Sequence, residues 1–292
     1  MAIAKGTETK DFSFKRFIGI GNVNVVAVNP TKAELAKLGR NVEEEPQYVT
    51  VKDDGTITAK VSLYVRPIEQ PDEIFTMNFF IRNSRFASPT KGTFQVIDSY
   101  GRTAWVTEEQ LAKHEIPIYK GDKPANIASN YRAAFLGENA LTQCLKAYLV
   151  ISDLTIYDKD NEKWVPNPKA TPADCEVRFD HIDKWFKGDF KEVKEAFAMQ
   201  PNNTVQALFG VRTDDQNRQS QTYFSDKFYK GIKDTNGTYR ADAFAKELDK
   251  INSNPATSSR YANTEFEFCP LKEYAPTATN FEQEETKENP WD

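Results

Sequence analysis

The sequence predicts an α+β fold in which a mainly antiparallel sheet curls into a barrel and carries a helical insertion. Apolar and polar residues alternate through most of residues 12–106, which is the pattern of half-buried strands. Residues 107–200 instead show apolar spacings of three and four, and alternation returns after residue 204. Because strands and helices occur in blocks, a parallel sheet built from alternating strands and helices is not expected.

The first block begins with a strand and a short helix. Alternation starts at 17–28, and Pro30 ends this strand. Thr31 and Glu34 then form a capping box, so we expect a helix that stops at Gly39. The remaining strands of this block are expected at 57–66, 74–82 and 93–106.

The second block is predicted to be the helical insertion, at about 107–200. Thr107 precedes two glutamates, an arrangement that favours the start of a helix. Residues 138–150 and about 172–199 have helical spacing, and Gly188 interrupts the second of these helices.

The third block returns to strands. We expect strands at 204–213 and 219–229, joined by a hairpin turn at 214–217. A polar helix at about 239–251 follows, and after it come a loop that contains Pro255 and a strand at 264–271.

Charge divides the chain into a body and a tail. The 292 residues carry a net charge of −5, of which −4 lies in residues 276–292. The body, residues 1–275, is therefore neutral to within one charge. Its length and composition predict one domain. The tail is rich in Pro, Thr, Asn, Gln and Glu and offers little apolar surface, so we expect it to be disordered.

Cysteine and histidine usage argues against a metal site and against an extracellular framework. Cys144, Cys175 and Cys269 are odd in number and far apart, which fits a reducing compartment. His114 and His181 have no metal-ligand spacing to Cys or Asp. We find no signal peptide or apolar run of membrane-spanning length. The sequence therefore predicts no enzyme, no cofactor, no metal and no membrane partner.

Three of the predicted strands place aromatic rings beside cations on their polar face. Single-stranded nucleic acid requires this combination, because unstacked bases pack on rings and phosphates pair with cations. The strand-face candidates are Tyr64, Arg66, Phe80, Arg82, Tyr223, Lys227 and Tyr229. Further candidates in the connecting segments are Arg85, Phe86, Tyr100, Arg102, Tyr131 and Arg132. An alternative stays open, in which these rings form cross-strand pairs or lie beneath the helical insertion.

Six stretches carry a resemblance to a known family. They are FIGIGNVNVVAVNPTKAEL at 17–35, FQVIDSYGRTAWVTEEQ at 94–110, PANIASNYRAAFLGENALTQCLKAYL at 124–149, DCEVRFDHIDKWFKGDF at 174–190, ALFGVRTDDQNRQSQTYF at 207–224 and YANTEFEFCPLKEY at 261–274. The chain resembles the single-stranded DNA-binding proteins of crAss-like bacteriophages. The resemblance implies an OB-like barrel that protects single-stranded DNA during phage replication and recombination in the cytoplasm of the bacterial host. It does not imply any enzymatic activity.

The acidic tail is similar in kind to the tails of bacterial and phage single-strand binders. We expect it to compete with DNA for the basic groove and, once displaced, to recruit phage replication proteins. The residues assigned to this role are Phe281, Glu284, Glu285, Trp291 and Asp292. Lys15 and Arg16 precede the first strand, and self-association through them is a further hypothesis. The alternative function is a virion structural or cargo protein that does not bind nucleic acid.

Overall fold

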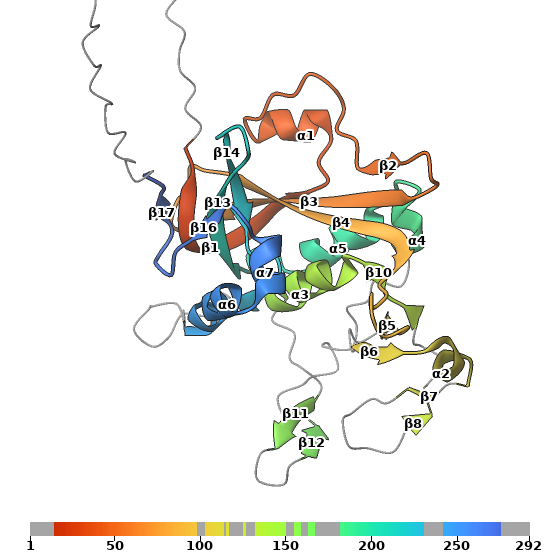
Figure 1. The fold of residues 1–292 in the computed structure, drawn as a ribbon. Coiled ribbons are helices and arrows are strands. Elements are labelled where there is room, and N and C mark those ends of the chain that lie inside the picture. The colour runs from red at the N-terminus through yellow and green to blue at the C-terminus, as the bar shows by residue number, and fades with distance from the viewer. Residues whose placement is uncertain are drawn as a thin grey trace, which may run out of the picture.

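The computed structural model describes residues 15–97, 103–113, 115–116, 125–126, 132–149, 155–158, 163–166, 182–230 and 242–275. Within these ranges the fold is α+β and centres on a ten-stranded sheet whose ladders are antiparallel (Figure 1). Its long strands are β1 (Phe17–Val28), β3 (Ile57–Pro67), β4 (Phe75–Arg85), β13 (Val205–Thr213) and β14 (Gln219–Tyr223). They lie in the order β4, β3, β1, β13, β14. The prediction of a mainly antiparallel α+β fold is confirmed.

The described strands do not close into a barrel. β4 and β14 lie toward opposite ends of the strand order and form no ladder with each other. They are joined instead by a side chain, since the Tyr223 hydroxyl donates a hydrogen bond to the Asn78 carbonyl oxygen at 2.7 Å. The sheet is therefore curled and open between β4 and β14.

Shorter strands extend the main sheet and form three small ones. The additions to the main sheet are β2 (Val49–Val51), β10 (Phe135–Leu136), β15 (Tyr229–Lys230), β16 (Thr264–Phe266) and β17 (Lys272–Glu273). A three-stranded sheet contains β5 (Phe94–Ile97), β6 (Thr103–Val106) and β9 (Arg132–Ala133). Two hairpin-like pairs are β7 (Glu115–Ile116) with β8 (Ala125–Asn126), and β11 (Thr155–Asp158) with β12 (Lys163–Pro166).

Seven helices lie within the described ranges. They are α1 (Lys32–Lys37), α2 (Glu108–Ala112), α3 (Glu138–Tyr148), α4 (Ile182–Trp185), α5 (Lys191–Ala198), α6 (Asp242–Ser253) and α7 (Pro255–Arg260). Capping boxes begin α1 at Thr31 and α2 at Thr107, as the sequence indicated. Over the part of the chain described, none of these helices is long and apolar enough to span a membrane.

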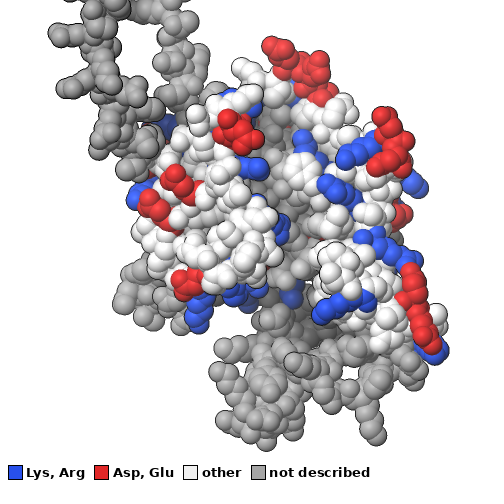
Figure 2. All heavy atoms as spheres, in the orientation of Figure 1, with Lys and Arg blue, Asp and Glu red and all other residues white. Residues whose placement is uncertain are grey.

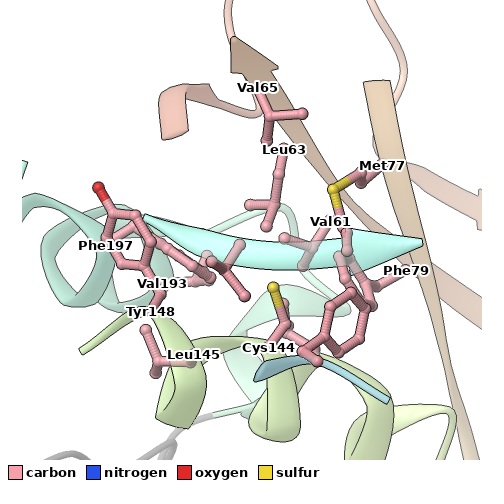
Figure 3. Close-up of a cluster of buried hydrophobic side chains, with 14 of the residues drawn as sticks. Val61, Leu63, Val65, Met77, Phe79, Cys144, Leu145, Tyr148, Val193 and Phe197 are labelled. Carbon is pink, nitrogen blue, oxygen red and sulfur yellow. The ribbon is translucent and has the colours of Figure 1, made fainter. Parts of the chain in front are cut away.

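The main hydrophobic core lies between the inner face of β3 and β4 and the helices α3, α4 and α5 (Figure 3). Alternate strand residues point into it, so the residues between them point to the other face. The labelled core residues are Val61, Leu63, Val65, Met77, Phe79, Cys144, Leu145, Tyr148, Val193 and Phe197.

A second core covers the opposite face of β1 and β13. Ile20 and Leu208, which are paired across these strands, pack there with Phe224, Phe244 of α6 and Tyr261. The sheet is thus covered on both faces over β1 and β13. The outer face of β3 and β4 instead carries exposed side chains, among them Phe80 at 56% exposure.

Four predicted elements differ from the structure. The strand expected at 264–271 is β16, which ends at Phe266. The insertion expected to be helical at about 107–200 also carries the short strands β7 to β12. The strand expected at 219–229 ends at Tyr223, because Phe224 turns into the second core and its neighbour Ser225 donates its backbone N–H to the Tyr261 hydroxyl. The loop expected at Pro255 is the helix α7. Pro is favourable in the first turn of a helix, and the Asn254 side chain caps this one by accepting from the Ala256 N–H at 3.0 Å.

Candidate nucleic-acid interface

The outer face of β3 and β4 brings a ring and several cations together. In the antiparallel register Lys60 lies opposite Phe80, and Arg82 lies opposite Thr58. Tyr64 lies further along β3 on the same face, because strand residues of equal parity share a face. Four of the seven strand-face candidates therefore share a single face, with Phe80 and Arg82 toward one end of it and Tyr64 and Arg66 toward the other.

Two arginines on this face have exposed side chains. Arg82 lies two residues after Phe80 and Arg66 lies toward the other end of β3, and neither guanidinium has a hydrogen-bond or ion-pair partner among the described residues. Phe80 is itself 56% exposed, although an apolar ring of this size usually gains by burial. Among the described residues, the ring and the two guanidinium groups are thus exposed without a side-chain hydrogen bond or ion pair.

A close contact holds Phe80 in place. Gly137, just before α3, has φ of 92°, and a Cβ atom at this position would lie 2.0 Å from the Phe80 carbonyl oxygen. Only glycine allows α3 to begin so close to β4. The backbone beneath the exposed ring is therefore fixed by the packing of α3.

The five long strands carry positive charge only. Their cations are Lys60, Arg66, Arg82, Arg85 and Arg212, and none of the five strands contains Asp or Glu. The whole chain has a net charge of −5, so its acidic residues lie in other parts of the sequence. Figure 2 shows Lys and Arg side chains on the β3–β4 side of the molecule, together with Asp and Glu side chains that come from other elements. A phosphate bound on these strands would therefore not be repelled by an acidic side chain of the strands themselves.

Tyr64 is less open than Phe80. It is half-buried, and the guanidinium carbon of Arg40 lies 5.7 Å from the centroid of its ring. Arg40 also donates a hydrogen bond to the Ile74 carbonyl oxygen, which fixes it over the ring. Tyr64 and Arg40 thus form a preassembled cation–π pair at the end of the face.

A groove of about 400 Å³ adjoins this face between β4 and β14. Asn78 and Phe80 line one side of it, and Arg212 and Arg260 line the other. Arg260 is engaged by Asp226, whereas Arg212 has no hydrogen-bond or ion-pair partner for its guanidinium in the described ranges. The molecule is visibly hollowed on this side in Figure 2. The groove and the β3–β4 face share Phe80 and therefore form one continuous surface.

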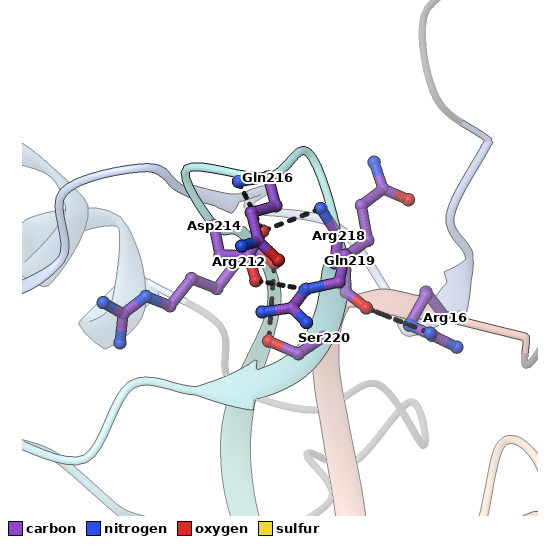
Figure 4. Close-up of polar contacts among 7 residues, drawn as sticks. All are labelled: Arg16, Arg212, Asp214, Gln216, Arg218, Gln219 and Ser220. Carbon is purple, nitrogen blue, oxygen red and sulfur yellow. Dashed lines mark hydrogen bonds and ion pairs between the residues drawn. The ribbon is translucent and has the colours of Figure 1, made fainter.

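Hydrogen bonds to the Asp214 side chain span the hairpin between β13 and β14 (Figure 4). Asp214 accepts from the backbone N–H groups of Gln216 and Arg218, both at 2.9 Å, and from Arg218 Nε at 2.8 Å. Hydrogen bonds from Arg218 hold the pKa of Asp214 below its usual value. Asn217 supplies the left-handed residue of the turn, with φ of 59°. The hairpin predicted at 214–217 is confirmed, and it fixes the end of β13 that carries Arg212.

The N-terminal cations contact the same chain. Arg16 donates to the Gln219 carbonyl oxygen at 3.0 Å, and Lys15 lies 3.3 Å from a carboxylate oxygen of Glu273 (Figure 4 shows the Arg16 contact). Both residues are therefore anchored beside β14 and β17. Self-association through them stays a prediction.

Tyr223 and Tyr229 do not lie on a free polar face, and that expectation was wrong. Tyr223 packs against the main core, 5.8 Å from Phe79 between ring centroids, and burial raises the pKa of its hydroxyl. Tyr229 packs edge-on against Phe244 at 4.8 Å in the second core. For Tyr229 the error follows from the early end of β14, which breaks the alternation. Tyr223 is still within β14, but its side chain packs against the main core and lines the groove between β4 and β14. Lys227 is half-buried and has no ion-pair partner among the described residues.

Arg85 and Arg132 are engaged in contacts within the fold. The Arg85 guanidinium lies 4.9 Å from the centroid of the Phe94 ring and forms an ion pair with Glu108. Arg132 pairs at 2.5 Å with Glu138, whose side chain is only 1% exposed. Arg132 therefore compensates a buried charge, a structural role rather than a free binding role.

The remaining site candidates are placed as follows. Phe86 is half-buried, with its ring against Trp105. The candidates Tyr100, Arg102, Tyr131, Phe281, Glu284, Glu285, Trp291 and Asp292 lie outside the described residues, as do Cys175, His114 and His181. Within the described ranges, no group of three or more His, Cys, Asp or Glu side chains is arranged to hold a metal ion.

Sequence reasoning missed three cations of this surface. Lys60 could have been found, because it shares the alternation of Tyr64 along the same strand. Arg212 follows a run of residues that are buried on both faces of β13, so no alternation marks it. Arg40 lies in a loop and reaches Tyr64 only through the fold.

Comparisons with known proteins find no family model, no curated protein and no solved structure that matches this chain. The chemistry of the β3–β4 face is therefore the basis for assigning a function.

Proposed function

We propose that this protein binds single-stranded DNA without sequence specificity, along the outer face of β3 and β4 and into the groove beside β14. One observation carries the proposal. The exposed ring of Phe80 shares one strand face with Arg82, its near neighbour, and with Arg66 toward the other end of β3. Among the described residues neither guanidinium has a hydrogen-bond or ion-pair partner, and β3 and β4 contain no acidic residue. Bases would stack on the ring while phosphates pair with the guanidinium groups.

The exposed ring favours single strands over duplex DNA. A duplex keeps the faces of its bases inside the stack, whereas a single strand can offer them to an aromatic side chain. Every base has such a face, so stacking on Phe80 does not discriminate among sequences. Lys60, opposite Phe80 in the register, adds a further charge for the backbone of the strand.

The order of the strands supports an OB-like architecture. An OB fold is a five-stranded, partly open barrel whose second and third strands form the oligonucleotide-binding face. In this chain β3 and β4 are the second and third of five long strands, and the sheet is open between β4 and β14. The proposed binding face thus corresponds to the one that this fold uses.

The resemblance to phage single-strand binders suggests the biological role. We infer that the protein protects single strands during phage DNA replication and recombination in the host cytoplasm. Residues 276–292 carry a net charge of −4 and would compete with DNA for the same cations. When DNA displaces the tail, its residues would become available to phage replication proteins.

Fluorescence anisotropy with labelled oligo-dT at several salt concentrations tests the proposal. We expect binding that weakens with salt, by about 0.7 in the slope of log K for each phosphate neutralised, and weaker binding to a duplex of equal length. A folded protein without affinity for oligo-dT at low salt would exclude this function. That result would favour a structural or cargo protein of the virion.

A further inference from the structure

The strand β4 leads directly into the small sheet of β5, β6 and β9. β4 ends at Arg85, and the next residue, Phe86, donates its N–H to the Ala134 carbonyl oxygen at 2.9 Å. The Phe86 carbonyl oxygen accepts from the Gln95 N–H at 2.7 Å. Within segment 132–136, β9 pairs with β5 and β10 pairs with β4. Backbone hydrogen bonds therefore hold the small sheet at the end of the proposed DNA-binding face.

Trp105 presents an exposed ring at this junction. It lies on β6 opposite Gln95, and its side chain is 43% exposed. Its ring centroid lies 5.3 Å from that of Phe86, with 59° between the ring planes. The buried cluster of the small sheet consists of Phe94, Val96 and Val106 and does not include Trp105. Phe86 thus supports a tryptophan ring that remains open to a ligand.

The geometry points to Trp105 as a second base-stacking platform, on which the single strand continues after Phe80. This inference rests on the proposed function and extends its site. Arg82, which has no partner in the described ranges, follows Phe80 on β4 and would hold the phosphates between the two rings. At a strand rise of about 3.3 Å per residue, Phe80 and Phe86 lie about 20 Å apart. Binding sites of about 4–16 nucleotides per OB fold accommodate such a span.

The charges around Trp105 do not oppose this path. Glu108 on α2 forms an ion pair with Arg85, and Glu109 forms one with Lys113 at 2.5 Å. The two carboxylates that follow Trp105 in the sequence are therefore compensated. A phosphate near Arg85 would compete with Glu108 for the same guanidinium.

Tryptophan fluorescence can report on this one position. The chain has four tryptophans, and Trp185 is fully buried at 0% exposure. Replacing Trp164 and Trp291 by Phe leaves Trp105 as the exposed emitter. Binding is followed in parallel by anisotropy of labelled oligo-dT, with oligonucleotides of about 4 and about 16 nucleotides, the ends of the usual site-size range.

We expect the long oligonucleotide to quench the emission and the additional Trp105→Phe substitution to remove this quenching. Trp105→Ala should weaken binding of the long oligonucleotide by about 5- to 100-fold and leave the short one unaffected. Tight binding of long oligo-dT with unchanged emission would overturn the inference and leave the proposed function standing, even if Trp105→Ala did not fold. Failure of every form to bind oligo-dT would overturn both.

Discussion

The Tyr223 hydroxyl donates a hydrogen bond to the Asn78 carbonyl oxygen at 2.7 Å and so links β14 to β4, two strands that share no ladder. Asn78 lies two residues before Phe80 on β4. The bond thus sets the width of the groove that adjoins the proposed binding face.

Removing this hydroxyl should destabilise the fold modestly. We expect Tyr223→Phe to lower the free energy of unfolding by about 1 kcal/mol, the usual net value of one hydrogen bond. Urea denaturation followed by circular dichroism measures this change. A variant as stable as the parent protein would show that the link between β4 and β14 does not contribute to stability.

Alkaline pH should destabilise the protein through its buried tyrosines. Burial, with a smaller effect of Glu247, raises the pKa of Tyr229 from 10 to about 12. The unfolded chain therefore releases this proton before the folded chain does, so stability is intact below pH 10 and is lost as pH rises toward about 12. Urea denaturation across this range should show a shallower decline for Tyr229→Phe. An identical pH dependence in the two proteins would refute this assignment.

Substitutions of Arg132 and Arg82 should have different effects, because Arg132 stabilises the fold whereas Arg82 is proposed to bind DNA. Arg132→Met leaves the buried Glu138 without its ion-pair partner, and we expect a loss of about 1–3 kcal/mol in stability. Arg82→Met removes an exposed side chain, so stability should change by less than about 0.5 kcal/mol. The slope of log K against log salt for oligo-dT should instead fall by about 0.7.

Lys191→Gln provides the control for this pair. Lys191 lies on α5, the helix that packs against the inner face of the sheet, and its side chain is 78% exposed. The Lys191→Gln substitution should change neither the free energy of unfolding nor the slope of log K against log salt appreciably. If Arg82→Met and Lys191→Gln reduced the slope equally, the effect would reflect overall charge and not this face.

Deleting residues 276–292 should strengthen DNA binding at low salt. The deletion removes a net charge of −4 that is tethered to the binding domain. Because salt screens this competition, the gain in affinity should shrink as ionic strength rises. Oligo-dT titrations of the full and truncated chains at two salt concentrations give the comparison. Equal affinities at low salt would rule out autoinhibition by the tail.

Local patterns predicted the part of the fold that carries the candidate site. Alternation along 57–66 and 74–82 gave β3 and β4 with the correct faces, because one face is buried and the other is solvated. The capping box at Thr31 and Glu34 likewise gave α1. Such signals depend only on neighbouring residues in the sequence, so they can be recognised before the three-dimensional structure is known.

Contacts between distant residues could not be predicted in this way. Tyr223 lies 145 positions from Asn78, and no local pattern indicates that its hydroxyl reaches β4. The ion pair of Arg132 with Glu138 is close in sequence, yet the burial of Glu138 depends on how α3 packs against the sheet. The sequence therefore indicated which residues bear rings and charges, but not which of them the fold had already engaged.

Substitution of Phe80 tests the central claim most directly. Phe80 is 56% exposed on the proposed face, and Phe268, 44% exposed in the loop between β16 and β17, is its matched control. Affinity for oligo-dT is measured by anisotropy for both alanine variants, after circular dichroism has shown that each is folded. We predict that Phe80→Ala weakens binding by about 1–3 kcal/mol and that Phe268→Ala does not. Equal affinity of Phe80→Ala and the parent protein would contradict binding at the β3–β4 face.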